Sequence, residues 1–186
     1  DNHMSTLHVE NLKGLSSGGN ANKIIIPSGQ TLDASNGFTA PAGHVIQMQN
    51  AGISGNASTT SSTSFIDTGL SVNITPKFAT SKILVIVHTV ISIGNGANHA
   101  RVDFRCLESG GTEVYRMDYH GTDGTQNGNI QKNMSGSGIF PCSNTNQLTF
   151  KTQVQKANST AGETGTIYYF WYVGSSHTIT ALEIAA

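Results

Sequence analysis

The side chains that could support acid–base catalysis are few in this chain and gather in one place. Glu113, Asp118, His120 and Asp123 lie within one short stretch. Enzymes that cleave glycosidic bonds need a pair of carboxylates beside a groove. Glu113, however, shares a strand-like segment with Arg116, which favours a surface ion pair. The sequence also lacks the usual nucleophile, zinc-protease, phosphate-loop and Cys-x-x-Cys motifs. We therefore predict that the protein is not an enzyme.

The same stretch is the strongest candidate for a metal site. Residues 117–128 place oxygen ligands and a histidine in a glycine-rich loop, and hard cations such as calcium favour such loops. The spacing matches no calcium-binding loop, and Gly-Asp sequences are also common at hairpin tips. We predict a loop tip without metal or cofactor. The other histidines form no His-x-His motif, although an axial histidine in a trimer would supply three ligands; they include His8, His44, His88, His99 and His177.

Side chains around this loop also suit carbohydrate recognition. Aromatic rings cover the apolar faces of sugars, while Asn, Asp and Gln side chains hydrogen-bond their hydroxyls. An alternative is that the two tyrosines are ordinary strand residues, and the loops at residues 94–99 and 158–165 compete as binding loops. The predicted receptor-binding residues are Tyr115, Tyr119, His120, Asp123, Gln126 and Asn127.

The composition is typical of a β protein with few charges. Charged residues make up 11% of the 186 residues, against about a quarter in average soluble domains. The net charge is −1 and no basic stripe is present, which argues against nucleic-acid binding. No apolar run reaches the length of a membrane span. Cys106 and Cys142 are expected to be buried reduced thiols, with a single bridge as the alternative.

The first residues bear on where the protein is made. Residues 1–3 precede Met4 and are typical of a cloning remnant. No basic region followed by an apolar segment comes after Met4. We therefore expect synthesis in a cytoplasm without export by the general route, as for a particle assembled inside a host cell.

Residues 4–42 are predicted to be an attachment or shaft segment. Residues 23–27 are an apolar β piece, and turn signals follow at residues 27–29 and 36–37. The segment has too few apolar side chains to bury a core alone. It either winds together with other copies of the chain or is a flexible tether, and both interpretations fit the pattern.

Residues 43–186 are predicted to form an all-β sandwich or jelly roll that begins after the Pro41-Ala42-Gly43 boundary. Leu70, Val72 and Ile74 alternate with polar residues, as do Val102, Phe104 and Cys106, and turn clusters separate such runs. A strand is expected from residue 44 to 49 and a loop over 51–62. The further expected strands are 64–68, 70–75, 81–93, 100–107, 113–119, 129–140, 146–156, 165–173 and 178–185.

Two of the expected strands are apolar on both faces, at residues 83–87 and 168–173. A sandwich buries only one face of each strand against its own core, so the other face needs a second partner. A neighbouring subunit supplies one. We therefore predict an oligomer, with Tyr168, Phe170 and Tyr172 at its interface.

Two segments carry a resemblance to a known group of proteins. Residues 60–87 (TSSTSFIDTGLSVNITPKFATSKILVIV) resemble the opening strands of jelly-roll modules in virion structural proteins of tailed phages. Residues 4–21 (MSTLHVENLKGLSSGGNA) resemble the N-terminal lead of phage fibre or appendage proteins. In trimeric jelly rolls similar to tumour necrosis factor and complement-type heads, the last strand lies near the three-fold axis. This resemblance implies trimer contacts by Ile179, Ala181 or Leu182, and Ile184.

The resemblance also implies a role. It indicates a homotrimeric fibre or spike on the virion surface that mediates attachment to a host-surface glycan or envelope protein. Residues 5–42 would join other virion proteins. A capsid-decoration protein without a receptor is one alternative. A polysaccharide-degrading tail enzyme is another, and the 11 thinly spread acidic residues argue against it.

Overall fold

The structure, a computed structural model, describes residues 14, 16–19, 21, 23–30, 41–54, 58–94, 100–121, 130–157, 166–170 and 176–186. Every regular element within these residues is a β-strand, which confirms the all-β prediction. The chain divides into two compact units, Asp1–Thr39 and Ala40–Ala186, and the strands of the described residues all belong to the second.

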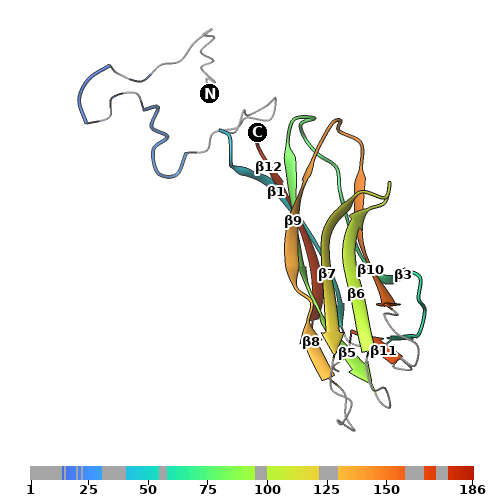
Figure 1. Ribbon diagram of the computed structural model, residues 1–186. Helices are drawn as coiled ribbons and strands as arrows, with labels where there is room; N and C mark the ends of the chain where they lie inside the picture. The colour runs from blue at the N-terminus through green and yellow to red at the C-terminus, as the bar shows by residue number, and fades with distance from the viewer. Residues whose placement is uncertain are drawn as a thin grey trace, which may run out of the picture. The chain divides into compact units, whose positions relative to one another are not determined.

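The second unit is built from antiparallel sheets (Figure 1). Each sheet contains four strands, and each strand is hydrogen-bonded to its neighbours in the sheet. In the first sheet the strand order is β1 (Val45–Ser54), β12 (Ser176–Ile184), β4 (Lys82–His88) and β9 (Gly136–Pro141). In the second sheet it is β3 (Ile66–Ile74), β10 (Leu148–Ala157), β6 (Ala100–Glu108) and β7 (Glu113–Gly121). In the third sheet it is β2 (Ser58–Thr60), β11 (Thr166–Tyr169), β5 (Val90–Gly94) and β8 (Ile130–Asn133).

The short third sheet continues the first one, strand by strand. Thr89 alone separates β4 from β5, and β5 pairs with β8 as β4 pairs with β9. Likewise, β11 lies between β2 and β5 as β12 lies between β1 and β4. When β1 with β2, β4 with β5, β8 with β9, and β11 with β12 are each counted as one long strand, the unit has eight long strands in chain order. One sheet then holds the first, eighth, third and sixth long strands, and the other holds the second, seventh, fourth and fifth. This order defines a jelly roll, as predicted.

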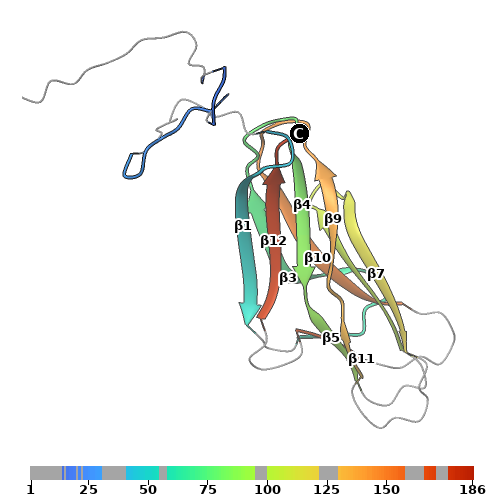
Figure 2. The same cartoon turned by 90° about the vertical axis from the view of Figure 1, so that its left-hand side faces the viewer.

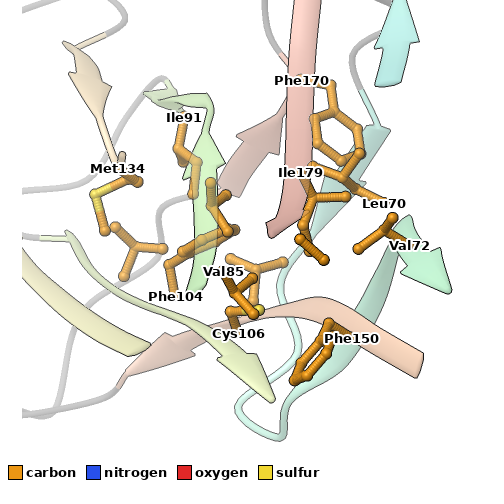
Figure 3. Close-up of a cluster of buried hydrophobic side chains, with 14 of the residues drawn as sticks. Leu70, Val72, Val85, Ile91, Phe104, Cys106, Met134, Phe150, Phe170 and Ile179 are labelled. Atoms are coloured by element: carbon orange, nitrogen blue, oxygen red, sulfur yellow. The ribbon is translucent and has the colours of Figure 1, made fainter. Parts of the chain in front are cut away.

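The core lies between the two large sheets and follows the alternation of the strands (Figure 3). The predicted inward residues of β3 and β6 are all buried, while Ser71 and Asn73 on the other face of β3 are exposed. The rings of Phe140 and Phe150 meet edge to face across the core at 5.5 Å. Each such pair adds to the stability that burial of apolar surface provides.

The structure joins two strands that the sequence separates at Gly69. Strand β3 runs through this glycine, whose φ of 89° lies in the left-handed region that favours glycine. The register with β10 shifts between Lys151 and Gln153, which marks a β-bulge. The glycine therefore bends one strand and does not end it.

Pairing with distant strands also overrides two local predictions. Residues 51–54 and 58–60 lie in β1 and β2, although a loop was expected there, because β12 and β11 complete their hydrogen-bond ladders. Strand β11 ends at Tyr169, before the expected residue 173, and Phe170 follows it. Its φ of 59° is left-handed, and its buried ring lies 5.4 Å from Tyr169 and 4.8 Å from His177.

In the first unit, a turn forms where the sequence predicts it. The Gln30 amide donates to the Pro27 carbonyl at 3.0 Å, and Gly29 has a φ of 81°. Residues 23–27 have no strand partner among the described residues, so the predicted β piece does not form within this part of the chain. Ile24, Ile25 and Ile26 are consequently exposed.

A buried histidine sits at the interruption between β4 and β5. His177 Nδ1 lies 3.1 Å from Thr89 Oγ1, and the Val90 amide donates to the same nitrogen at 3.4 Å. Burial lowers the pKa of His177 below its usual value of 6.5, and nearby His88 lowers it further. The folded protein therefore keeps this imidazole neutral at a pH where the unfolded chain takes up a proton.

We expect the protein to lose stability as the pH falls from about 6.5 toward the lower folded-state pKa of His177, because only the unfolded state binds the proton in this window. Urea unfolding measured between pH 8 and pH 5 tests this. The loss should be smaller in His177→Gln than in the unchanged chain. Equal pH dependence in both proteins would contradict the assignment.

Candidate functional site

The two tyrosines of the predicted receptor-binding group lie on β7 and pack against the core. The Tyr115 hydroxyl donates to the Met134 carbonyl at 3.4 Å, and burial raises the pKa of this phenol. Lys132 Nζ lies 4.8 Å from the centre of the Tyr119 ring. Both rings are therefore half-buried on a strand, as the alternative interpretation expects, and their role in receptor binding stays a prediction.

The remaining members of that group are not placed by the structure. His120 pairs with Arg101 in the ladder between β7 and β6. Its side chain lies outside the described part of the chain, as do Asp123, Gln126 and Asn127. Their role in receptor binding stays a prediction.

The edge of the sandwich near Tyr115 is closed by two glycines of β9. A Cβ atom built on Gly136 would lie 2.0 Å from Cε2 of the Tyr115 ring, and one on Gly138 would lie 2.0 Å from the Val114 carbonyl oxygen. Strands β7 and β9 belong to different sheets, so these contacts join the two sheets along one edge. Neither position tolerates a side chain without movement of β7 or of the ring.

The outward face of the β3-β10-β6-β7 sheet carries paired charges. Arg116 lies 3.7 Å from Glu113, 3.4 Å from Asp103 and 3.3 Å from Asp118. The predicted ion pair between Glu113 and Arg116 is therefore confirmed, and the structure shows that it belongs to a larger network. Arg101 joins it through Asp103 at 3.4 Å and Asp118 at 3.5 Å.

The network continues across the sheet around an aromatic ring. The Arg105 guanidinium lies 3.8 Å from the centre of the Phe65 ring and donates to Gln153 Oε1 at 2.9 and 2.7 Å. Gln153 in turn donates to Asp67 at 2.6 Å, and Lys151 donates to Asp67 at 2.9 Å. These two hydrogen bonds hold the pKa of Asp67 below its usual value. Acidic and basic side chains on this face thus lie in ion-pair contact with one another.

The outward face of the β1-β12-β4-β9 sheet is different. Strand register places four apolar side chains side by side across it: Met48 opposite Leu182, Leu182 opposite Leu84, and Leu84 opposite Ile139. Figure 2 shows the four strands in this order. We call these four residues the outer apolar row. Its two ends are well exposed, with 61% of Met48 and 60% of Ile139 accessible to solvent.

The predicted interface residues fall into three groups. Leu182 and Ile184 are half-buried and alternate with the buried residues of β12, so they lie on the outward face. Phe170 and Ile179 are buried in the core of the subunit itself, and their side chains do not face a partner, contrary to the prediction. The side chain of Tyr168 and all of Tyr172 lie outside the described residues.

The two-faced character predicted for residues 83–87 is present in β4. Ile83, Val85 and Val87 are buried, while Leu84 is half-buried and Ile86 is 41% exposed on the other face. The apolar outward face that the sequence predicts at β4 therefore exists. The strand register extends it over the other three strands of the sheet, β1, β12 and β9.

A buried carboxylate that the sequence interpretation missed holds the loop between β3 and β4. Glu183 is fully buried, and its oxygens accept hydrogen bonds from the Lys77 amide at 2.8 and 3.0 Å, the Phe78 amide at 3.1 Å and Gln47 Nε2 at 2.6 Å. Burial acts to raise the pKa of Glu183, but the hydrogen bonds outweigh it and lower the pKa. Glu183 follows the apolar residues Ile179 and Ala181 at every second position along β12, so it shares their buried face. This spacing is the feature of the sequence that could have revealed a buried acid.

Within the described residues, no group of three or more His, Cys, Asp or Glu side chains is arranged to hold a metal ion. Both cysteines are free thiols, and burial raises the pKa of Cys106 to about 12. Such a thiol is a poor nucleophile because little of it is ionised at neutral pH. The described residues include no helix long and apolar enough to cross a membrane.

Comparisons with known proteins identify no family for this chain. No family model matches the sequence, and no curated protein matches it. Among solved structures, the VP2 subviral particle of infectious bursal disease virus is similar with a TM-score of 0.41 and 15% identity, over 87% of this chain and 42% of that one. A structure of the infectious bursal disease virus Gt strain is similar with a TM-score of 0.39 and 17% identity, over 87% of this chain and 43% of that one.

The insecticidal delta-endotoxin Cry8Ea1 from Bacillus thuringiensis is similar with a TM-score of 0.37 and 16% identity, over 70% of this chain and 20% of the toxin. This chain thus spans less than half the length of the proteins it matches. At these scores the likenesses assign no function, and the jelly-roll assignment rests on the strand order.

Proposed function

We infer that the chain is a non-enzymatic structural protein of a virion, namely a trimeric fibre or spike appendage through which a tailed phage attaches to its host. The observation that carries this inference is the contrast between the two outward faces of the jelly roll. One face bears a network of paired charges and the other bears the outer apolar row. A subunit of a larger assembly covers such an apolar face, whereas a monomer leaves it in water.

The first unit supports attachment to other virion proteins. Three consecutive isoleucines, Ile24 to Ile26, are exposed and belong to no strand among the described residues. An exposed apolar segment of this kind is suited to burial against another chain. Residues 5–42 are therefore assigned to the contact with the particle, and loops of the jelly roll to the host glycan or envelope protein. Repetition in a trimer raises weak single-site affinity through avidity.

Two measurements test this proposal. Light scattering should give a mass of about 60 kDa for the full chain, three times 19.6 kDa. Immunogold labelling of particles whose genome encodes the chain should place it on the tail. Labelling of the head would instead support a capsid-decoration protein, and unlabelled particles would contradict a virion role.

Truncation separates attachment from recognition. A chain that starts at Ala42 should no longer bind particles but should still bind the host-surface glycan found by array screening with the full chain. Retained particle binding would contradict the role given to residues 5–42. Release of shortened saccharides from the bound glycan would contradict the non-enzymatic assignment.

A further inference from the structure

The outward face of the β1-β12-β4-β9 sheet is uncharged over its central part. Beside the outer apolar row, the next row across the sheet consists of Asn50, Thr180, Ile86 and Ser137. Lys82 and His88 lie only at the two ends of β4. The opposite outward face carries charges on all four strands, as the ion pairs of β3, β10, β6 and β7 show. The two faces therefore differ in charge as well as in apolar character.

Two polar side chains near the centre of the uncharged face are hydrogen-bonded to each other within the subunit. Asn50 Nδ2 donates to Thr180 Oγ1 at 2.7 Å and to the Ile179 carbonyl at 3.4 Å. The Asn50 amide donor therefore keeps its partners when the face is covered, which lowers the main cost of burying a polar surface. The hydrogen bonds of Asn50 thus reduce the cost of burying this face against an apolar partner.

The size of the face suits a specific contact. Neighbouring strands lie about 4.8 Å apart and same-face rows lie about 6.8 Å apart, so four strands and four rows cover about 500 Å². Two such faces together bury about 1,000 Å², which is near the lower limit for a specific protein–protein interface. A single small ligand would leave most of this surface in water.

We propose that this face, centred on the outer apolar row, is the contact between copies of the chain. A second copy presents the same uncharged apolar surface, whereas a charged partner would lose hydration without gaining an opposite charge. Three such faces around a three-fold axis enclose one apolar interior. The inference rests on the proposed assembly function and specifies the surface that the assembly uses.

Charge substitutions on this face test the contact. In the full chain, Ile139→Glu and Ile86→Glu should each weaken association at least about tenfold, because a buried unpaired carboxylate faces the partner. Ser71→Glu is the matched control, because it adds the same charge at an exposed position on the other outward face. Light scattering over a dilution series should show single chains of 19.6 kDa for the two variants where the unchanged and control chains stay assembled.

Met48 gives a readout that does not depend on how a variant folds. Its exposed thioether reacts with hydrogen peroxide, which supplies the oxygen of the sulfoxide and leaves water. Peptide mass spectrometry should show at least about fivefold slower oxidation of Met48 in the assembled chain than in the diluted chain, because a covered thioether meets less oxidant. Met134, which is buried within the subunit, should react slowly in both.

Three results would overturn the inference: a chain that is monomeric at every concentration, assembly that survives both substitutions, or equal oxidation of Met48 in both states. Failure of the virion role has a different signature. Unlabelled particles together with a protected Met48 would remove the phage function and leave the contact between copies in place.

Discussion

Gly138→Ala is expected to lower the free energy of unfolding by about 3 kcal/mol, the upper part of the range for overpacked positions. The new Cβ atom would lie 2.0 Å from the backbone oxygen of Val114, and a backbone atom cannot rotate away. Relief requires β7 and β9 to separate along the edge where the two sheets meet. Urea unfolding followed by circular dichroism measures the change.

Two companion substitutions show whether the close approach causes this loss. Ser137→Ala lies on the exposed face of the same strand and should change stability by less than about 0.5 kcal/mol. Gly136→Ala meets the Tyr115 ring and not a backbone atom, so it should be less harmful when combined with Tyr115→Ala than when made alone. A Gly138→Ala protein as stable as the unchanged chain would contradict the packing described for this edge.

The sequence predicts the fold class and the inward faces of several strands because this information is local. Alternation of apolar and polar residues in β3 and β6 requires only that each strand have one buried face. The structure confirms that the apolar residues of both strands face the core. The same logic predicts the apolar outward side of β4, since a second set of apolar residues in one strand is visible without knowledge of its neighbours.

The pairing of one strand with another cannot be read from local sequence, and most of the incorrect predictions come from unknown strand pairing. Residues 51–54 look like part of a Gly/Ser/Thr loop until β12 provides their hydrogen-bond partners. Likewise, Ile179 and Leu182 are equally apolar, but only the phase of β12 in the sheet decides that the first is buried and the second faces outward. A strand register that shifts by one residue would exchange them.

The candidate sites depend even more on distant contacts. The charged face unites residues from four strands, and the sequence reveals only the pair Glu113 and Arg116, which are three residues apart. The tyrosines chosen for sugar binding have suitable chemistry, but the glycines of β9 provide the space that their strand packs into. Residue type alone does not distinguish a binding ring from a packing ring.

Glu183→Gln is expected to lower the free energy of unfolding by about 3 kcal/mol at neutral pH, because hydrogen bonds to a buried charged group contribute more than neutral ones. The carboxylate accepts from two backbone amides and from Gln47. The amide of glutamine keeps one acceptor oxygen and turns two N–H donors toward groups that are themselves donors. The loop between β3 and β4 then loses its anchor to β12.

The pH dependence of this difference follows from the lowered pKa of Glu183. A carboxyl group with a depressed folded-state pKa contributes full stability above its usual value of 4.5 and loses it as the pH falls through the folded-state pKa. The gap between the unchanged chain and Glu183→Gln should therefore be constant at neutral pH and narrow in acid. Glu113→Gln, which removes a partly exposed ion pair, should change stability by less than about 1 kcal/mol.

Hydrogen exchange locates the effect within the molecule. The amides of Lys77 and Phe78 donate to Glu183 and should exchange faster in Glu183→Gln. The exchange rates of amides in the ladder between β6 and β10 should change only as far as the global stability changes. A uniform loss of protection would show that the carboxylate acts on the whole sandwich. Unchanged exchange at both amides would contradict its role as the anchor of this loop, because among the described residues Glu183 is the group that accepts from these two N–H groups.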